Sequence, residues 1–268
     1  MNVIELQEVS KLYGFGDATT VALEDINVDV KRGEFLAIMG PSGSGKSTLM
    51  NIIGLLDRPT SGDYLLNNRK VSKFRSNRRA KTRRDHIGFI FQNHNLLPKI
   101  TVIENVALPL AYKGFSTVKR LEKASSILEN LGLKTREYYF PSQLSGGQIQ
   151  RAAIARALVN EPDIILADEP TGNLDSQNSI EVMNLLKKLH DDGSTILMVT
   201  HNPELTKYAD RIIYLKDGKV EHDAPLAKNE IVDIEDIEKR PRRPRRKSKK
   251  TSSRKPRRSR SRSRSKKS

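Results

Sequence analysis

The sequence predicts an α/β fold with a mixed, largely parallel core sheet and an inserted α-helical subdomain. Short apolar runs bounded by turn residues, at 34–40, 163–169 and 195–201, are typical of strands buried on both faces. Stretches with helical spacing alternate with these runs, as in a parallel sheet covered by helices. Between about residues 95 and 160 the pattern is mostly helical, so we expect the insertion there.

The first elements follow from local patterns. Residues 2–9 and 26–30 alternate apolar and polar side chains and favour strands. After the apolar strand 34–40 comes a glycine-rich turn and then a helix, whose apolar residues repeat at helical spacing: Leu49, Ile52, Ile53 and Leu56. Proline and glycine within 57–62 are expected to end this helix.

The later elements are predicted in the same way. The stretch 117–133 has the apolar spacing of a helix, and a second helix is expected at about 177–190. The segment 211–221 is typical of a β-hairpin that turns at Asp217 and Gly218.

The charge of the chain is concentrated at one end. The sequence has 48 basic and 32 acidic residues, a net charge of +16, but 18 of the basic residues and none of the acids lie in 239–268. Residues 1–238 therefore have a net charge of −2. We predict a catalytic domain over 1–222, an acidic linker over 223–238 and a disordered basic tail over 239–268, since the tail has no large apolar side chain to bury.

The remaining composition bears on the cellular location. There is no cysteine, and no apolar run approaches the ~18 residues of a membrane span. The N-terminus is acidic and lacks the apolar core of a secretory signal. We therefore expect a cytoplasmic location.

A phosphate-binding loop is predicted between the strand at 34–40 and the following helix. The segment GPSGSGKST fits the spacing G-x-x-x-x-G-K-[ST], in which backbone N–H groups and the helix N-terminus face a phosphate. Lys46 is expected to reach the β- and γ-phosphates, and the Ser47 hydroxyl to bind Mg²⁺. The candidate nucleotide-binding residues are Gly40, Pro41, Ser42, Gly43, Ser44, Gly45, Lys46, Ser47 and Thr48.

Two carboxylates end the apolar strand near residue 168. Asp168 and Glu169 would lie at the edge of the sheet where the phosphate loop opens. Asp168 is a candidate Mg²⁺ ligand, and Glu169 could orient and deprotonate the attacking water.

A third motif, LSGGQ at 144–148, precedes a predicted helix. Ser145 and Gln148 have the spacing of a capping box. The order of GPSGSGKST, then LSGGQ, then ILADE resembles the ATP-binding-cassette (ABC) ATPases, and the resemblance covers about residues 3–222.

The resemblance implies further roles. Tyr13 matches the aromatic residue that stacks on adenine, and because the ring does the stacking, Tyr13→Phe is expected to be nearly silent. Gln92 matches the glutamine that joins the core to the helical subdomain and contributes to the Mg²⁺ site. Asp175 matches an aspartate at the dimer contact, and His201 matches the catalytic switch histidine that follows the last core strand. The residues that would contact the ATP of a second chain are Ser145, Gly146, Gly147 and Gln148.

At the level of subfamily, segments such as 38–62 and 95–110 resemble ATPases of the macrolide-exporter and lipoprotein-release type. The resemblance implies ATP and Mg²⁺ as cofactors, a head-to-tail homodimer in the ATP-bound state, and a separate transmembrane permease as partner. It places the chain at the inner face of the plasma membrane, in transport or in envelope mechanics. The alternative is a soluble ABC ATPase that acts on nucleic acid or ribosomes, although such relatives usually have two cassettes or a long coiled-coil insertion.

The basic tail departs from the family. It could add solubility, bind anionic lipid, bind RNA or DNA phosphates, or dock on the acidic stretch 230–238. Our hypothesis is that the tail is an electrostatic anchor outside the catalytic machinery.

Overall fold

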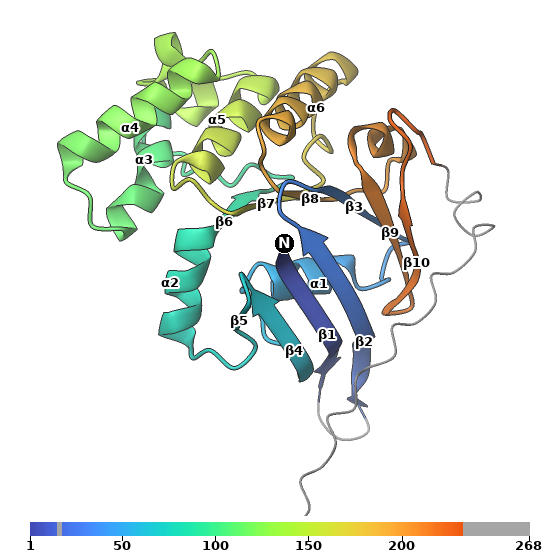
Figure 1. The fold of residues 1–268 in the computed structure, drawn as a ribbon. Coiled ribbons are helices and arrows are strands. Elements are labelled where there is room, and N and C mark those ends of the chain that lie inside the picture. The colour runs from blue at the N-terminus through green and yellow to red at the C-terminus, as the bar shows by residue number, and fades with distance from the viewer. Residues whose placement is uncertain (15–17, 233–268) are drawn as a thin grey trace, which may run out of the picture.

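The computed structural model describes residues 1–14 and 18–232. The basic tail predicted for 239–268, and most of the acidic linker, lie outside these residues. The described chain forms two sheets with helices packed around them (Figure 1).

The larger sheet is mixed and mostly parallel, as predicted. Its strand order is β10-β9-β3-β8-β7-β6, and only the β9–β10 hairpin is antiparallel. The strands are β3 (Phe35–Met39), β6 (Ile87–Ile90), β7 (Ile164–Asp168), β8 (Ile196–Val199), β9 (Arg211–Lys216) and β10 (Lys219–Pro225). The predicted hairpin at Asp217 and Gly218 is confirmed, because Lys216 pairs with Lys219 across the turn.

Helices cover both faces of this sheet (Figure 1). The helix α1 (Lys46–Ile53) lies on one face, and α5 (Gly146–Leu158) and α6 (Ser176–Asp191) lie on the other. Successive side chains of β3 point to opposite faces of the sheet. Leu36 and Ile38 pack with α1, whereas Phe35 packs with α5 and α6. This double burial explains why β3 is a continuous apolar run.

The smaller sheet is antiparallel and packs over α1 (Figure 1). Its order is β2-β1-β4-β5, formed by β1 (Asn2–Tyr13), β2 (Thr20–Lys31), β4 (Ser61–Leu66) and β5 (Arg69–Lys70). The sequence predicts parts of β1 and β2 but not this sheet, because β1 also pairs with β4, some fifty residues later in the chain.

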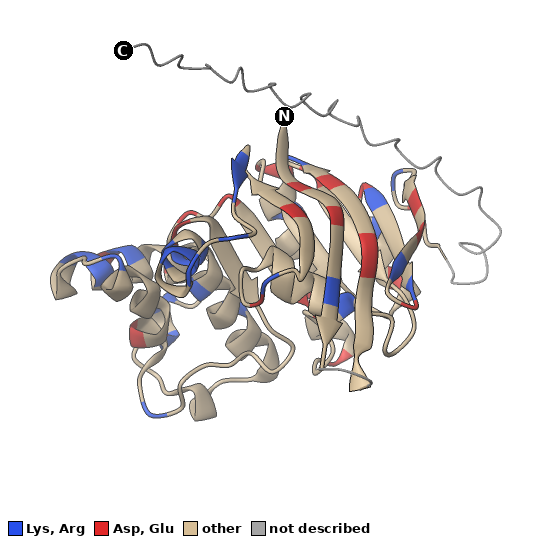
Figure 2. Ribbon diagram, turned by 90° about the horizontal axis from the view of Figure 1, so that it is seen from below, with Lys and Arg blue, Asp and Glu red and all other residues tan. Residues whose placement is uncertain are grey.

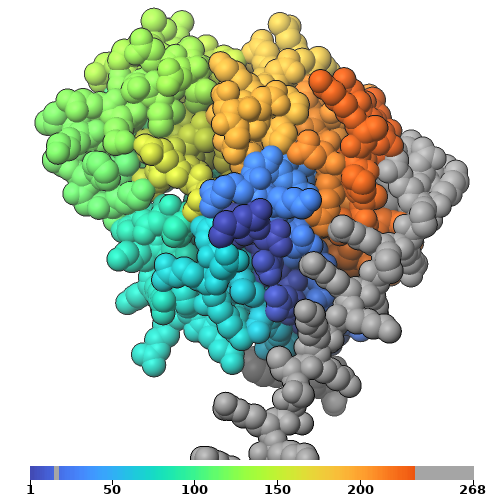
Figure 3. Space-filling view, in the orientation of Figure 1, coloured from blue at the N-terminus to red at the C-terminus, as the bar shows by residue number. Residues whose placement is uncertain are grey.

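The helical subdomain contains α3 (Val102–Tyr112), α4 (Thr117–Asn130) and α5, which share one apolar cluster. A capping box of Thr101 and Glu104 begins α3. Short 3₁₀ turns at Lys134–Arg136 and Pro141–Gln143 lead into α5. In Figure 3 this subdomain is the green lobe beside the body of the molecule.

One helix was not predicted. The helix α2 (Ser76–His86) has no buried residue, so it lacks the apolar periodicity that reveals the others. It carries several cations, and Figure 2 shows Lys and Arg gathered on it. A 3₁₀ helix, η4 (Pro203–Tyr208), completes the elements, and the fold extends past residue 222 to a buried Val232. None of the helices in the described residues is long and apolar enough to cross a bilayer.

Candidate functional site

The predicted phosphate loop connects β3 to α1, and its glycines are required by the backbone. Gly40 has φ +150°, and a Cβ there would lie 2.0 Å from the carbonyl oxygen of Leu215. Gly45 has φ +100°, a left-handed value at the start of α1, and a Cβ there would lie 2.6 Å from the Ala22 carbonyl oxygen. The loop is therefore folded tightly against its neighbours at both ends.

Lys46 is the first residue of α1 and turns back over this loop. Its Nζ donates to the carbonyl oxygens of Gly40, at 2.8 Å, and Pro41, at 2.7 Å. Burial lowers the pKa of Lys46, while the charges of Glu169 and Asp168 oppose that shift. The sequence-predicted lysine and the two carboxylates are thus close enough to interact electrostatically.

Asp168 is the last residue of β7 and pairs with Val199 of β8. Burial raises the pKa of its carboxyl, the negative charge of Glu169 raises it further, and Lys46 lowers it. Burial and a neighbouring carboxylate thus make the negative charge of Asp168 unfavourable, and a cation bound beside it would relieve that cost.

Glu169 follows directly and has an unusual backbone. Its φ is +44°, in the left-handed region that disfavours residues with a Cβ. Its N–H donates to the carbonyl oxygen of Val199 at 2.9 Å, and its carboxylate lies 2.8 Å from Nδ1 of His201. The structure therefore brings Glu169 and His201 into contact, a pairing that the motifs did not specify. Backbone strain of this kind is often found at functional sites.

Gln92 follows β6 and packs against the loop after Glu169. A Cβ on Gly172 would lie 2.7 Å from the Gln92 side-chain nitrogen. The side chain of Asn173 donates to the carbonyl oxygen of Gln92 at 3.1 Å and to the Asn93 side chain at 2.9 Å. The segment after β6 and the segment after β7 are therefore bonded together.

The signature loop, residues 145–148, begins α5 with the predicted capping box. Ser145 and Gln148 exchange bonds of 3.0 and 3.3 Å between backbone and side chain. A Cβ on Gly147 would lie 2.0 Å from the side-chain oxygen of Asn178 in α6. Asp175, the candidate dimer contact, caps α6 and accepts from the N–H and side chain of Asn178, at 2.8 and 2.6 Å. Asn178, which no motif indicated, thus links the signature loop to Asp175.

Tyr13 ends β1 and has 43% of its surface exposed, so its ring is accessible to a ligand. Its hydroxyl donates to Asp57 at 2.8 Å, a contact that the sequence did not indicate.

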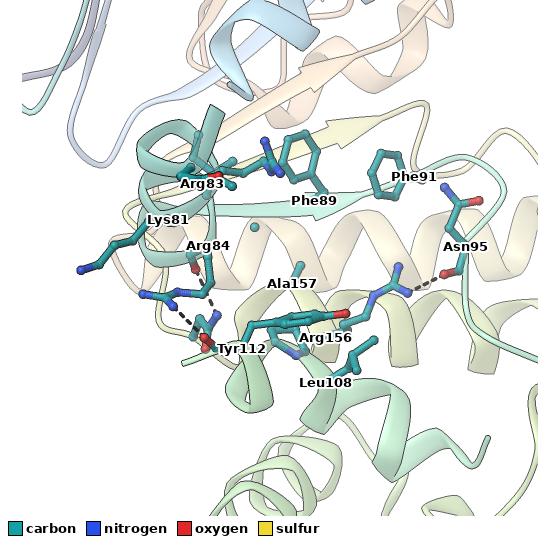
Figure 4. Close-up of a pocket in the computed structure, with 16 residues that line it drawn as sticks. Lys81, Arg83, Arg84, Phe89, Phe91, Asn95, Leu108, Tyr112, Arg156 and Ala157 are labelled. Carbon is teal, nitrogen blue, oxygen red and sulfur yellow. Dashed lines mark hydrogen bonds between the residues drawn. The ribbon is translucent and has the colours of Figure 1, made fainter. Parts of the chain in front are cut away.

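A pocket of about 730 Å³ lies between α2, β6, α3 and α5 (Figure 4). Figure 3 shows a hollow between the teal surface around α2 and the green helical lobe. Its floor is apolar and aromatic, with Phe89 on β6, Phe91 directly after β6 and Tyr112 on α3. The cations that line it are Lys81, Arg83, Arg84 and Arg156, and no acidic residue lines it.

Arg156 connects this pocket to the segment after β6. Its guanidinium, largely buried, donates to the carbonyl oxygens of Asn95 at 2.5 Å and His94 at 2.7 Å. Both residues whose carbonyl oxygens accept these bonds have left-handed backbones, with φ of +59° at His94 and +51° at Asn95. Arg156, in the pocket wall, is therefore hydrogen-bonded to the backbone of the segment that follows Gln92.

Comparisons with known proteins agree with this arrangement. The family model described as ABC transporter matches residues 23–172. The chain is 50% identical over 221 residues to the ABC transporter ATP-binding protein YvrO of Bacillus subtilis, covering 82% of this chain and 96% of the relative. It is 48% identical over 227 residues to the macrolide export ATP-binding/permease protein MacB of Pasteurella multocida, covering 85% of this chain but 35% of that protein.

Solved structures give the same result. The chain resembles the ATP-binding cassette MJ0796 of Methanocaldococcus jannaschii, a dimer in a post-hydrolysis state bound to ADP and Pi, with a TM-score of 0.76 and 48% identity. The match covers 84% of this chain and 99% of that one. The chain therefore belongs to the ABC transporter family, and it is an ATP-binding, ATP-hydrolysing subunit of the kind that energises a membrane permease.

Proposed function

We propose that residues 40–48 bind the phosphates of ATP, with Lys46 on the β- and γ-phosphates and Tyr13 against the adenine. The support is geometric, since the glycine loop wraps the N-terminus of α1 and Lys46 turns over it. Mg²⁺ would be held by Ser47, Asp168 and Gln92, which offer the oxygen donors that this cation prefers. When bound, Mg²⁺ neutralises phosphate charge.

The observation that carries the hydrolytic assignment is the contact between Glu169 and His201 at 2.8 Å, beside Asp168 and Lys46. In the proposed reaction Glu169 orients a water molecule and accepts its proton. His201 holds the Glu169 carboxylate in place and lies beside the site of the γ-phosphate. The fixed backbone of Glu169 keeps the carboxylate at the end of β7 without reorganisation.

We further propose that the active form is a head-to-tail homodimer. In it Ser145, Gly146, Gly147 and Gln148 of one copy contact the ATP held by the other, and Asp175 lies at the contact. The dimeric state of the MJ0796 cassette supports this assembly. Asn178 supports it too, because this side chain hydrogen-bonds to Asp175 and packs closely against Gly147, so the signature loop and Asp175 lie on one surface of a single chain.

The pocket between α2 and the helical subdomain is the proposed docking site of the permease, at the inner face of the plasma membrane. MacB relatives are named as ATP-binding and permease proteins in one chain, and this chain spans about a third of their length. A separate permease would then supply the membrane part. The apolar floor with Tyr112 offers an anchor site, and the cationic wall suits an acidic partner segment. Arg156 would pass movement of that segment to Gln92 through the carbonyls at 94 and 95.

Mixing two inactive variants tests the composite site. Glu169→Gln inactivates the half of the composite site that contains the phosphate loop, and Ser145→Arg inactivates the half formed by the signature loop. A mixed dimer keeps one intact site, so an equal mixture should recover about a quarter of the wild-type sites if chains pair at random. Each variant alone is the control. A mixture that forms mixed dimers, detected by two affinity tags, but hydrolyses no ATP would contradict the proposal.

A further inference from the structure

The loop after α1 is fixed beside the proposed adenine site. The N–H of Thr60 donates to the Ser10 carbonyl oxygen at 2.8 Å, and the Thr60 hydroxyl accepts from the N–H of Leu12 at 3.0 Å. These bonds join the loop to the last residues of β1. Asp57 is consequently brought next to Tyr13, although the two lie 44 positions apart.

Asp57 is the centre of a small polar cluster. One carboxylate oxygen accepts from the Tyr13 hydroxyl at 2.8 Å and from Lys11 Nζ at 2.8 Å. The other oxygen accepts from the N–H of Arg58 at 2.6 Å. The Lys11 side chain is 12% exposed, and its Nζ lies 4.7 Å from the centre of the Tyr13 ring. A charged acceptor and a cation at the ring thus restrain the tyrosine from two directions.

The cluster also reaches the phosphate loop. The side chain of Thr48, in the first turn of α1, lies near enough to the Tyr13 hydroxyl to lower its pKa, against the larger effects of burial and Asp57. Thr48 is the last residue of the predicted phosphate-binding segment, and Asp57 lies just beyond the end of the same helix. The tyrosine hydroxyl therefore lies between residues from the two ends of α1, hydrogen-bonded to Asp57 and close to Thr48, which places the ring against the element that begins with Lys46.

We propose that Asp57 is a positioning residue that fixes the ring of Tyr13 for adenine and holds the base site in register with the phosphate loop. The inference rests on the proposed stacking of Tyr13. It also revises the expectation that Tyr13→Phe is nearly silent, because the hydroxyl removed by that change is the group that Asp57 holds.

A purely structural role is the competing explanation, in which the ion pair between Lys11 and Asp57 only ties β1 to the loop. The two roles differ in what they do to different ligands. A positioning role alters affinity for ligands that carry a base, whereas general loosening also alters affinity for the phosphate chain. Binding of ATP and of inorganic tripolyphosphate, each measured with Mg²⁺ by calorimetry, therefore separates them.

The variants are Tyr13→Phe, Asp57→Ala and the double variant. Losing one partner of a charged hydrogen bond is expected to raise the Kd for ATP by about 3- to 10-fold in either single variant. The double variant should lose no more than the stronger single one, because both changes break one bond. The Kd for tripolyphosphate should change less than about 2-fold, and Asp57→Asn, which keeps an acceptor, should recover part of the loss.

The control is Asp63→Asn, which breaks the exposed ion pair of Asp63 with Lys70 on the same sheet and should leave both ligands unaffected. Unchanged ATP affinity in Tyr13→Phe, or equal losses for ATP and tripolyphosphate, would overturn the proposal. Tyr13→Ala distinguishes failure of the Asp57 proposal from failure of the proposed stacking of Tyr13 on adenine. If it weakens ATP while Tyr13→Phe and Asp57→Ala do not, only the anchor fails; if it leaves ATP binding unchanged, the stacking assignment fails as well.

Discussion

The edge of the parallel sheet and the pocket beside α2 are built in different ways. At the sheet edge, residues 40–48 and 168–169 follow directly after buried strands, so a short stretch of sequence contains both the strand and the groups that it positions. The pocket is assembled from α2, β6, α3 and α5, whose lining residues are spread over more than eighty positions. The first region is the proposed site of ATP hydrolysis, whereas the second is the proposed docking site of a permease. Variants should therefore separate turnover from partner binding.

The largest effect is expected at the sheet edge. Glu169→Gln should lower ATP turnover by about 10²- to 10⁴-fold, because it removes the proposed general base while keeping the shape of the side chain. ATP should still bind, so the variant should accumulate as a dimer with ATP, measured by gel filtration and by a phosphate-release assay. The matched control is Glu161→Gln, which also has a left-handed backbone, with φ +55°, but lies outside the site. Turnover near the wild-type rate in Glu169→Gln would show that the base is another group.

The pocket should give a different result. Tyr112→Ala removes a side chain of a residue that is 68% exposed and lines the pocket. We expect affinity for a co-expressed permease to fall by about 30-fold or more, the usual effect of a buried tyrosine anchor, while the basal ATPase rate stays within about 2-fold. Tyr138→Ala is the control, since Tyr138 is 72% exposed and does not line the pocket. Equal losses of permease binding in both variants would contradict the docking site.

A smaller effect concerns the stability of the protein without ligand. The pKa of Asp168 is raised by burial and by Glu169, so its charged form destabilises the fold at neutral pH. Asp168→Asn should therefore raise the melting temperature by a few degrees at pH 7. The gain should vanish as the pH falls below about 3.9, the ordinary pKa of aspartate. The same variant should lose the stabilisation that MgATP gives the wild-type protein, measured by scanning calorimetry.

The control for this prediction is Asp163, which directly precedes β7, the strand that Asp168 ends. Burial raises the pKa of Asp163, but hydrogen bonds from His86, Arg32 and Asn67 lower it more, so the net shift is downward. Its charged form stabilises the fold above the ordinary aspartate pKa. Asp163→Asn should consequently lower the melting temperature at pH 7. If the melting temperature at pH 7 fell in both variants, the charge of Asp168 would be shown to stabilise the folded protein.

The smallest effect is expected from the tail. Deleting residues 239–268 should leave turnover at saturating ATP nearly unchanged, because the proposed site lies wholly within the described chain. It should abolish salt-sensitive binding to anionic vesicles or to nucleic acid, measured by co-sedimentation and filter binding at two salt concentrations. A truncated protein without ATPase activity would assign the tail to the catalytic machinery.

Local signals account for what the sequence could predict. The buried strands, the phosphate loop, the capping box of Ser145 and the turn at Asp217 are each specified within a few residues, and the structure contains all of them. The pairing of β1 with β4 could not be predicted, since it depends on residues far apart in the chain. Three contacts of the site were missed for the same reason, since each joins residues far apart in the chain. They are the hydrogen bond of Tyr13 to Asp57, the packing of Gly147 against Asn178, and the hydrogen bonds from Arg156 to the carbonyl oxygens of residues 94 and 95. These contacts exist only after the elements pack.

The left-handed backbone of Glu169 has a consequence for laboratory evolution. A residue with a Cβ at this φ costs about 1–3 kcal/mol, a penalty that glycine avoids. A library of variants selected for thermal stability alone should therefore enrich glycine at position 169. The selected proteins would be more stable but would lack the proposed catalytic carboxylate. Any screen for a durable form of this enzyme has to score ATP turnover in the same round as thermal resistance.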